Sequence, residues 1–219
     1  MCLSRSGTVE AERYESGLVG DLLAAVRAQV GLDTVMLLCL RSEGDEQTHL
    51  LLTIGPVAGA EWFRDPALER IWLDAADGGM LWARPGWIEE TREWVEGIAH
   101  AHGAGGIESA EQRRAWEFSC LVELRAGSHE WILKCVPRPF LREVRLLRAL
   151  SAEAPAHFPA IVAADESRQC VLMQRSRGTP LGDVKNERTR GEAVASYARL
   201  QIAWCRIIPP LGSLVDPEV

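Results

Sequence analysis

The stretch EWILKCVPRPFLREVRLL, residues 130–147, constrains the fold of this chain most strongly, because the spacing of its apolar residues changes part-way along. In WILKCV the side chains of a strand would alternate between two faces, so Lys134 would share one face with Ile132 and Val136. After the two prolines the apolar residues recur at the spacing of a helix. The sequence therefore predicts a strand followed at once by a helix, with a lysine on an apolar face of the strand.

A lysine in a buried strand needs an anionic partner, because a lone ammonium group costs free energy away from water. Glu143 follows Lys134 by nine residues and lies next to the apolar face of the expected helix. The helix can therefore fold back over the strand and place the carboxylate near the ammonium group. Two alternatives remain: an edge-strand lysine whose amine reaches water, and a glutamate that pairs with an arginine of its own helix. The apolar face of that helix is formed by Phe140, Val144, Leu147 and Leu150.

Length and composition are those of an ordinary globular chain, with 219 residues, 47% of them hydrophobic and 25% charged. This is enough for one large domain or two small ones. The first residues, MCLSRSGTVEAERYESG, lack the apolar segment of a secretory signal, and the run VMLLCL is too short to span a bilayer. We therefore expect a cytoplasmic protein that does not associate with a membrane.

Charge is distributed unevenly along the chain, whose net charge is −7. Residues 1–110 hold 8 basic and 18 acidic residues, whereas residues 111–206 hold 16 basic and 11 acidic residues. The acidic total argues against general binding of nucleic acid. The basic second half suits a small polyanion, although a solvated basic face explains its charge almost as well.

Cysteine and histidine give no sign of a metal centre. No two cysteines form a C-x-x-C pair, and several lie in apolar runs such as LLCL and LKCV. His100 and His102 are two residues apart and would diverge on a helix. We therefore expect buried free thiols, and neither disulfides nor a bound metal. The six cysteines are Cys2, Cys39, Cys120, Cys135, Cys170 and Cys205.

The first part of the chain is predicted to contain two segments. Residues 1–85 form a small α/β segment, with a helix at residues 17–30 and strands at residues 34–40 and 49–55. Residues 86–110 form a linker helix and a glycine-rich joint, because GWIEETREWVEGIAHAHG has helical spacing and AHGAGG follows it.

The second part of the chain is predicted to contain two further segments. Residues 111–178 contain three strands, then the helix of residues 139–154, then a strand pair around the turn DESRQ. In residues 179–219, Thr179 can cap a helical turn and Pro180 fits its first position. A helix at residues 192–206 and a tail follow.

A strand lysine followed by a helix glutamate, two strands and a glycine-marked connection resembles the small lobe of kinase-like phosphotransferases, with WILK in the place of their V-A-I-K motif. Within that superfamily, VLMQRSRGTPL and YARLQ are similar to the hinge and the following helix of the aminoglycoside phosphotransferase family. The likeness covers about residues 111–206, and WARPGW extends it to about residue 82. It implies an α+β fold, with an antiparallel sheet and one packed helix behind the α/β N-terminal segment.

The resemblance implies an ATP-binding site on this lobe. Lys134 would contact the α- and β-phosphates, Glu143 would orient the lysine, and Ile132 would pack on the adenine. The turn that covers the phosphates would lie at Ser119, although WEFSCLVEL has no G-x-G-x-x-G and a plain surface serine is the alternative. The rest of the pocket would be formed by Val171 and Met173 at its back and by backbone groups of Gln174, Arg175 and Ser176 at the adenine edge.

The resemblance does not extend to the catalytic groups. Phosphoryl transfer in this family needs an aspartate in an H-x-D-x-x-x-x-N loop and a later metal-binding aspartate. The 41 residues after Gly178 contain no histidine, and their aspartates are Asp183 and Asp216. We therefore expect a truncated member that binds ATP, has no catalytic or metal-binding residues of its own, and would need a complete large lobe to use Mg²⁺.

A non-enzymatic role is the alternative hypothesis. The face of the lobe on which a large lobe would dock could instead bind a protein partner or a second copy of the chain. Exposed apolar side chains would favour this hypothesis. Stabilisation by ATP that depends on Lys134 would favour the first.

Overall fold

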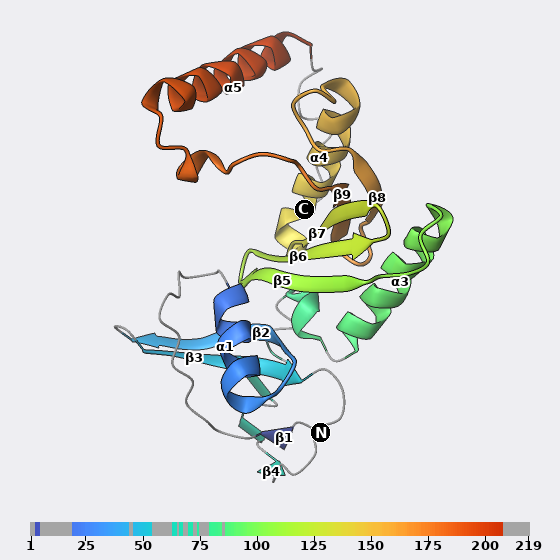
Figure 1. Cartoon of the computed structure of the whole chain (residues 1–219), viewed down its shortest axis with the longest axis vertical. Helices are drawn as coiled ribbons and strands as arrows, with labels where there is room; N and C mark the ends of the chain where they lie inside the picture. Colours follow the sequence, from blue (N-terminus) through green and yellow to red (C-terminus); the bar gives the residue numbers. More distant parts are fainter. Residues whose placement is uncertain are drawn as a thin grey trace. The chain divides into compact units, whose positions relative to one another are not determined.

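The computed structural model describes residues 3–4, 19–43, 46–53, 63–64, 66–67, 70–71, 74, 79–84 and 86–207. It divides into two compact units, Met1–Arg175 and Ser176–Val219, which are described separately. The described part contains four α-helices and antiparallel sheets (Figure 1). The expectation of a mixed α+β fold is confirmed at this level.

A five-stranded antiparallel sheet is the main element of the first unit (Figure 1). Its strand order is β5-β6-β7-β9-β8, so β7 is a central strand and β8 is at an edge. The hairpin between β6 and β7 turns at Gly127, whose φ of 59° lies in the left-handed region that glycine adopts without strain. The strands are β5 (Ser109–Trp116), β6 (Ser119–Ala126), β7 (His129–Cys135), β8 (Ile161–Asp165) and β9 (Cys170–Gln174).

Helix α3 (Trp87–Ala101) packs on one face of this sheet. Trp87, Val95 and Ala99 of the helix join a core with alternate residues of β7, among them Trp131 and Leu133. The expected linker helix is therefore part of the core of the first unit. The expected joint also shortens, because β5 already begins at Ser109.

Helix α4 (Leu141–Glu153) packs on the other face of the sheet. Val144 is completely buried there against Val136 and Val171. A short 3₁₀ helix, η2 (Arg138–Phe140), connects β7 to α4. Phe140 was expected in the apolar face of the helix, but it lies at the N-cap and is 36% exposed.

The N-terminal elements are helix α1 (Gly20–Val30) and the hairpin of β2 (Thr34–Glu43) and β3 (Glu46–Thr53), close to the expected helix and strands. The side chain of Gln112 on β5 accepts a hydrogen bond from the Met36 backbone N–H at 2.7 Å and donates one to the Met36 carbonyl at 2.9 Å. This amide joins β2 to β5. The first unit also contains β1 (Leu3–Ser4), β4 (Phe63–Arg64) and the 3₁₀ helix η1 (Leu81–Ala83).

The second unit contains a 3₁₀ turn, η3 (Leu181–Asp183), and helix α5 (Glu187–Ile207) (Figure 1). Pro180, rather than Thr179, is the N-cap of η3. The side chain of Asn186 accepts a hydrogen bond from the backbone N–H of Thr189 at 3.1 Å, so α5 begins five residues earlier than expected. The expected tail after Ile207 lies outside the described residues. Across the described ranges, no helix has the length and apolar character of a membrane span.

Arg145 and Glu166 tie α4 to the turn between β8 and β9. The Arg145 guanidinium donates to Oε2 of Glu166 from Nη2 at 2.8 Å and from Nε at 3.1 Å. This hydrogen bonding holds the pKa of Glu166 below its ordinary value of 4.5. A carboxylate whose pKa is depressed in the folded state stabilises that state at neutral pH, and the stabilisation is lost as pH falls through the folded pKa.

We expect Arg145→Gln to lower the free energy of unfolding near pH 7, and the difference from the wild type to shrink at an acid pH below the folded-state pKa of Glu166, where the carboxylate is protonated. Urea unfolding at the two pH values measures this difference. Arg188→Gln, which removes a more exposed pair with Glu192 on α5, is the matched control and should change little at either pH. A difference that is the same at both pH values would contradict this assignment.

Candidate functional site

The site is centred on an ion pair between β7 and α4. The ammonium group of Lys134 donates a hydrogen bond to Oε1 of Glu143. The Lys134 side chain is 23% exposed and that of Glu143 is 38% exposed, so both charges lie at the boundary of the core. The pairing expected from the sequence is therefore present. Since β7 has neighbours on both sides, the alternative of an edge-strand lysine is wrong.

Local structure explains why the two groups meet. The register of β7 places Lys134 on the face that α4 covers, opposite Val171 of β9. Val144 is buried in that face, and this contact orients α4 so that Glu143 lies at the edge of the contact. Glu143 is also in the first turn of the helix, where the partial positive charge of the N-terminus favours an anion.

Two residues of β6 share this face and were missed by the sequence analysis. Leu121 is the cross-strand partner of Lys134, and Glu123 is the partner of Ile132. The two-residue turn at Gly127 and Ser128 sets this register, because it makes Ala126 the partner of His129. The turn could have been recognised from the sequence, and counting back along both strands from it identifies both residues.

Glu123 is held by two arginines. Its carboxylate lies 2.9 Å from Nη2 of Arg113 on β5 and 3.5 Å from Nε of Arg175 at the end of β9. Arg175 also lies 3.7 Å from a carboxylate oxygen of Glu130. The surface next to Ile132 is thus polar but charge-balanced.

The segment expected to meet the adenine edge has part of its backbone already engaged. The Gln174 N–H donates to the carbonyl of Ala160 at 2.8 Å, and the Arg175 N–H donates to the carbonyl of Glu130 at 2.8 Å. The N–H groups of these two residues are therefore not available to a ligand. Ser176 is the first residue of the second unit and is described apart from this site.

Ser119 lies at the tip of the β5–β6 hairpin but is buried, with 6% exposure. Its hydroxyl oxygen accepts a hydrogen bond from the indole N–H of Trp116 at 2.7 Å. The alternative of a plain surface serine is therefore wrong. Next to it, Phe118 packs edge-on against Trp116 at 5.4 Å and against Phe140 at 5.8 Å between ring centroids. An aromatic cluster thus connects the hairpin tip to the start of α4.

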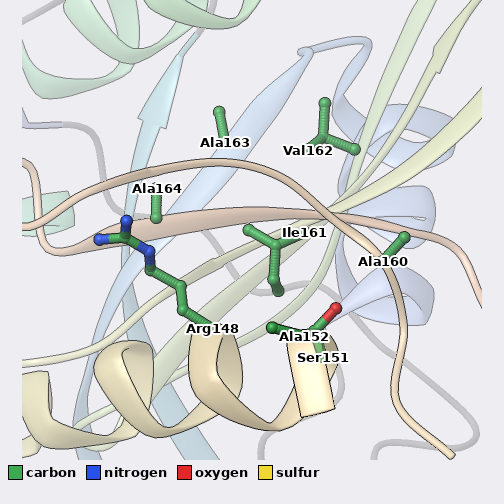
Figure 2. Close-up of a pocket in the computed structure, with 8 residues that line it drawn as sticks. All are labelled: Arg148, Ser151, Ala152, Ala160, Ile161, Val162, Ala163 and Ala164. Carbon is green, nitrogen blue, oxygen red and sulfur yellow. The ribbon is translucent and has the colours of Figure 1, made fainter. Parts of the chain in front are cut away.

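Val171 and Met173 are core residues. Val171 is completely buried and Met173 is 8% exposed, and both pack in the core under α4. A groove between α4 and β8 is lined by other residues and includes neither Lys134 nor Glu143 (Figure 2). The sequence analysis did not identify this groove.

The choice of lysine at position 134 is itself informative. Of the 24 basic residues in the chain, only Lys134 and Lys185 are lysine, and the others are arginine. A lysine presents a compact charge with three donors, whereas the planar arginine fork favours bidentate partners. The small number of lysines relative to arginines could have been found by counting residues in the sequence.

The cysteines near the site are free thiols. Cys120, Cys135 and Cys170 are partners in register across β6, β7 and β9, and all three are buried. Burial raises the pKa of the Cys120 thiol to about 12, so it stays protonated at neutral pH. Within the described ranges, no group of three or more histidine, cysteine or acidic side chains could hold a metal ion. The other three cysteine side chains lie outside the described part.

Comparisons with protein-family models, with curated proteins and with solved structures find no match for this chain. The function of the site is therefore argued from its residues and their geometry alone.

We expect a double-mutant cycle with Lys134→Met and Glu143→Gln to give a coupling energy of about 1 kcal/mol, because the pair is partly exposed and solvent screens it. Urea unfolding of the four chains at low ionic strength measures the coupling, which should fall as salt is added. The same cycle on Arg92 and Glu96 of α3, a more exposed pair, should give a smaller value. If the two pairs gave the same coupling energy, the result would contradict a special role for the Lys134 pair.

Proposed function

We propose that β5 to β9 and α4 form a nucleotide-binding lobe of the kinase-like type, similar in its motifs to the aminoglycoside phosphotransferase family. The observation that carries the proposal is the Lys134–Glu143 ion pair between a central strand and the helix that follows it. In protein kinases the phosphate-binding lysine lies on the third strand of the small lobe and pairs with a glutamate on the next helix. Here β7 is the third strand of its sheet along the chain, and α4 comes next.

The ion pair leaves the lysine able to bind phosphate. An ammonium group has three N–H donors, and one of them is directed at Glu143. The other two would reach phosphate oxygens, while the carboxylate holds the side chain in place. A lysine at this position suits phosphate as a point charge, in a chain that otherwise uses arginine almost throughout.

The adjoining surface would hold the base. Ile132 and Leu121 offer apolar contact on either side of Lys134 along this face. The carbonyl oxygens of Gln174 and Arg175 are acceptors, and their N–H groups are engaged in the sheet. Acceptors at this edge would favour the exocyclic amino group of adenine, which supports ATP as the nucleotide.

Binding, rather than phosphoryl transfer, is the function proposed for these residues. The 219 residues contain no H-x-D-x-x-x-x-N sequence. Transfer would need an aspartate to accept the proton of the substrate hydroxyl, and groups that hold Mg²⁺ on the phosphates. We therefore propose that this chain alone binds ATP and does not transfer its phosphate.

Mg-ATP is expected to raise the melting temperature of the chain in a saturable way. A ligand at 100 times its Kd adds about 2.7 kcal/mol to the free energy of unfolding, which for a chain of this size is roughly 5–10 °C. Lys134→Ala should abolish most of the shift, and Lys185→Ala, in the second unit, should retain it. Each variant is compared with itself without nucleotide, so differences in basal stability cancel. A shift that survives in Lys134→Ala, or none in the wild type, would refute the proposal.

Lysine labelling gives an independent measurement. Pyridoxal 5′-phosphate reacts with lysine amines, borohydride reduction makes the product permanent, and peptide mapping distinguishes Lys134 from Lys185. Mg-ATP should protect Lys134 and leave the labelling of Lys185 unchanged. Equal protection of both lysines, or of neither, would contradict a nucleotide at Lys134.

A second candidate function is protein interaction, and α5 is the observation that favours it. Val194, Tyr197 and Ile202 are large apolar residues of this helix, and each is more than half exposed. Such side chains commonly become buried when a partner binds. We propose that two copies of the chain associate with each other through α5.

Self-association is expected to increase with protein concentration in sedimentation velocity experiments. Tyr197→Glu should shift the chain toward monomer, because the substitution places a charge within the apolar contact. Ala203→Glu, at an exposed position on the opposite face of the same helix, is the control for the added charge and should have a smaller effect. A wild-type chain that is monomeric at all concentrations would remove this candidate.

A further inference from the structure

The groove between α4 and β8 lies in the first unit, away from the ion pair. It has a volume of about 450 Å³. Ala152 and Ser151 of the helix form one side, and the β8 segment forms the other (Figure 2). Small side chains thus leave room beside an edge of the sheet. The lining residues are Arg148, Ser151, Ala152, Ala160, Ile161, Val162, Ala163 and Ala164.

Strand β8 is a five-residue edge strand whose register against β9 shifts between Ile161 and Ala163, and its sequence has few residues that prevent pairing. In the described part of the chain it pairs with β9 only. The outer N–H and C=O groups of an edge strand can pair with another extended chain, and proteins often block them with lysine, proline or inward charges. The sequence of β8, IVAAD, has none of these before Asp165. The Asp165 carboxylate is itself engaged by Ser167 at 2.6 Å and by Arg168 at 3.2 Å.

Arg148 places a positive charge in the groove. It is exposed, and its side chain extends from α4 toward Ala164 of β8 (Figure 2). Its charge contributes to lowering the pKa of Glu166, whose carboxylate already accepts the hydrogen bonds of Arg145. A guanidinium group has five N–H donors, so Arg148 retains capacity for a further carboxylate.

We propose that this groove binds an extended peptide segment of a partner protein, which adds a strand to the free edge of β8 and places an acidic side chain on Arg148. Backbone pairing would supply the affinity, while the shallow alanine-lined surface would select small or β-branched side chains. A second copy of the chain is a poorer occupant. Its own β8 carries Asp165 as the one acidic residue, and that side chain is engaged with Ser167 and Arg168.

Selection of short random peptides displayed on phage against the full chain tests the proposal. The expected result is a consensus with alternating β-branched residues and an aspartate or glutamate at one position. The consensus of peptides selected against Arg148→Gln should no longer contain the acidic residue. Selection against Arg142→Gln, an exposed arginine of the same helix that does not line the groove, should keep it.

The affinity of a selected peptide then locates the site. Fluorescence anisotropy should show binding weakened about tenfold in Arg148→Gln, which corresponds to about 1.4 kcal/mol, and unchanged in Arg142→Gln. Replacing the acidic residue of the peptide by its amide should weaken binding to the wild type and not to Arg148→Gln. Hydrogen exchange at β8 should slow when the peptide is bound. A selection that gives no consensus, or a peptide whose binding is weakened equally in both variants, would overturn the proposal.

Discussion

The register of β7 between β6 and β9 is the constraint on which the five-stranded sheet and the two helices packed on it depend. Successive residues of β7 alternate between two cores, so Trp131, Leu133 and Cys135 face α3 while Ile132 and Val136 face α4. A slip of one residue would reverse every side chain of the strand. It would place the ammonium group of Lys134 in the tryptophan-containing core and separate it from its carboxylate. The ion pair is therefore a consequence of correct pairing in the sheet.

The two helices contribute differently to the site. Helix α3 fills the face of the sheet that lies away from Lys134, and its role is packing. Helix α4 is oriented by the burial of Val144, and this orientation brings Glu143 to the lysine and places Arg148 toward β8. One packing contact thus positions the charged groups of both proposed sites. The two sites can nevertheless be tested separately, because their lining residues differ.

Sequence reasoning succeeded where a pattern was local. The change of spacing after WILKCV predicted β7 and α4, and the nine-residue separation predicted that Lys134 and Glu143 could meet. It was less successful where burial depends on distant elements. Phe140 has the helical spacing of a core residue but lies at the N-cap and packs on Phe118 of the hairpin tip. Ser119 looks like a turn residue but is buried under Trp116.

The amino-acid sequence by itself determined the order of strands and helix from β5 to β9, the change of period between β7 and α4, and the identity of the charged pair. These follow from local spacing and from the cost of burying an unpaired charge. Only the tertiary structure decided that β9 lies between β7 and β8, which leaves β8 as a free edge. It alone also showed that the expected linker helix α3 packs on one face of the sheet and contributes buried residues to the core. Strand order and helix packing depend on contacts between residues far apart in the chain, and local periodicity carries no information about them.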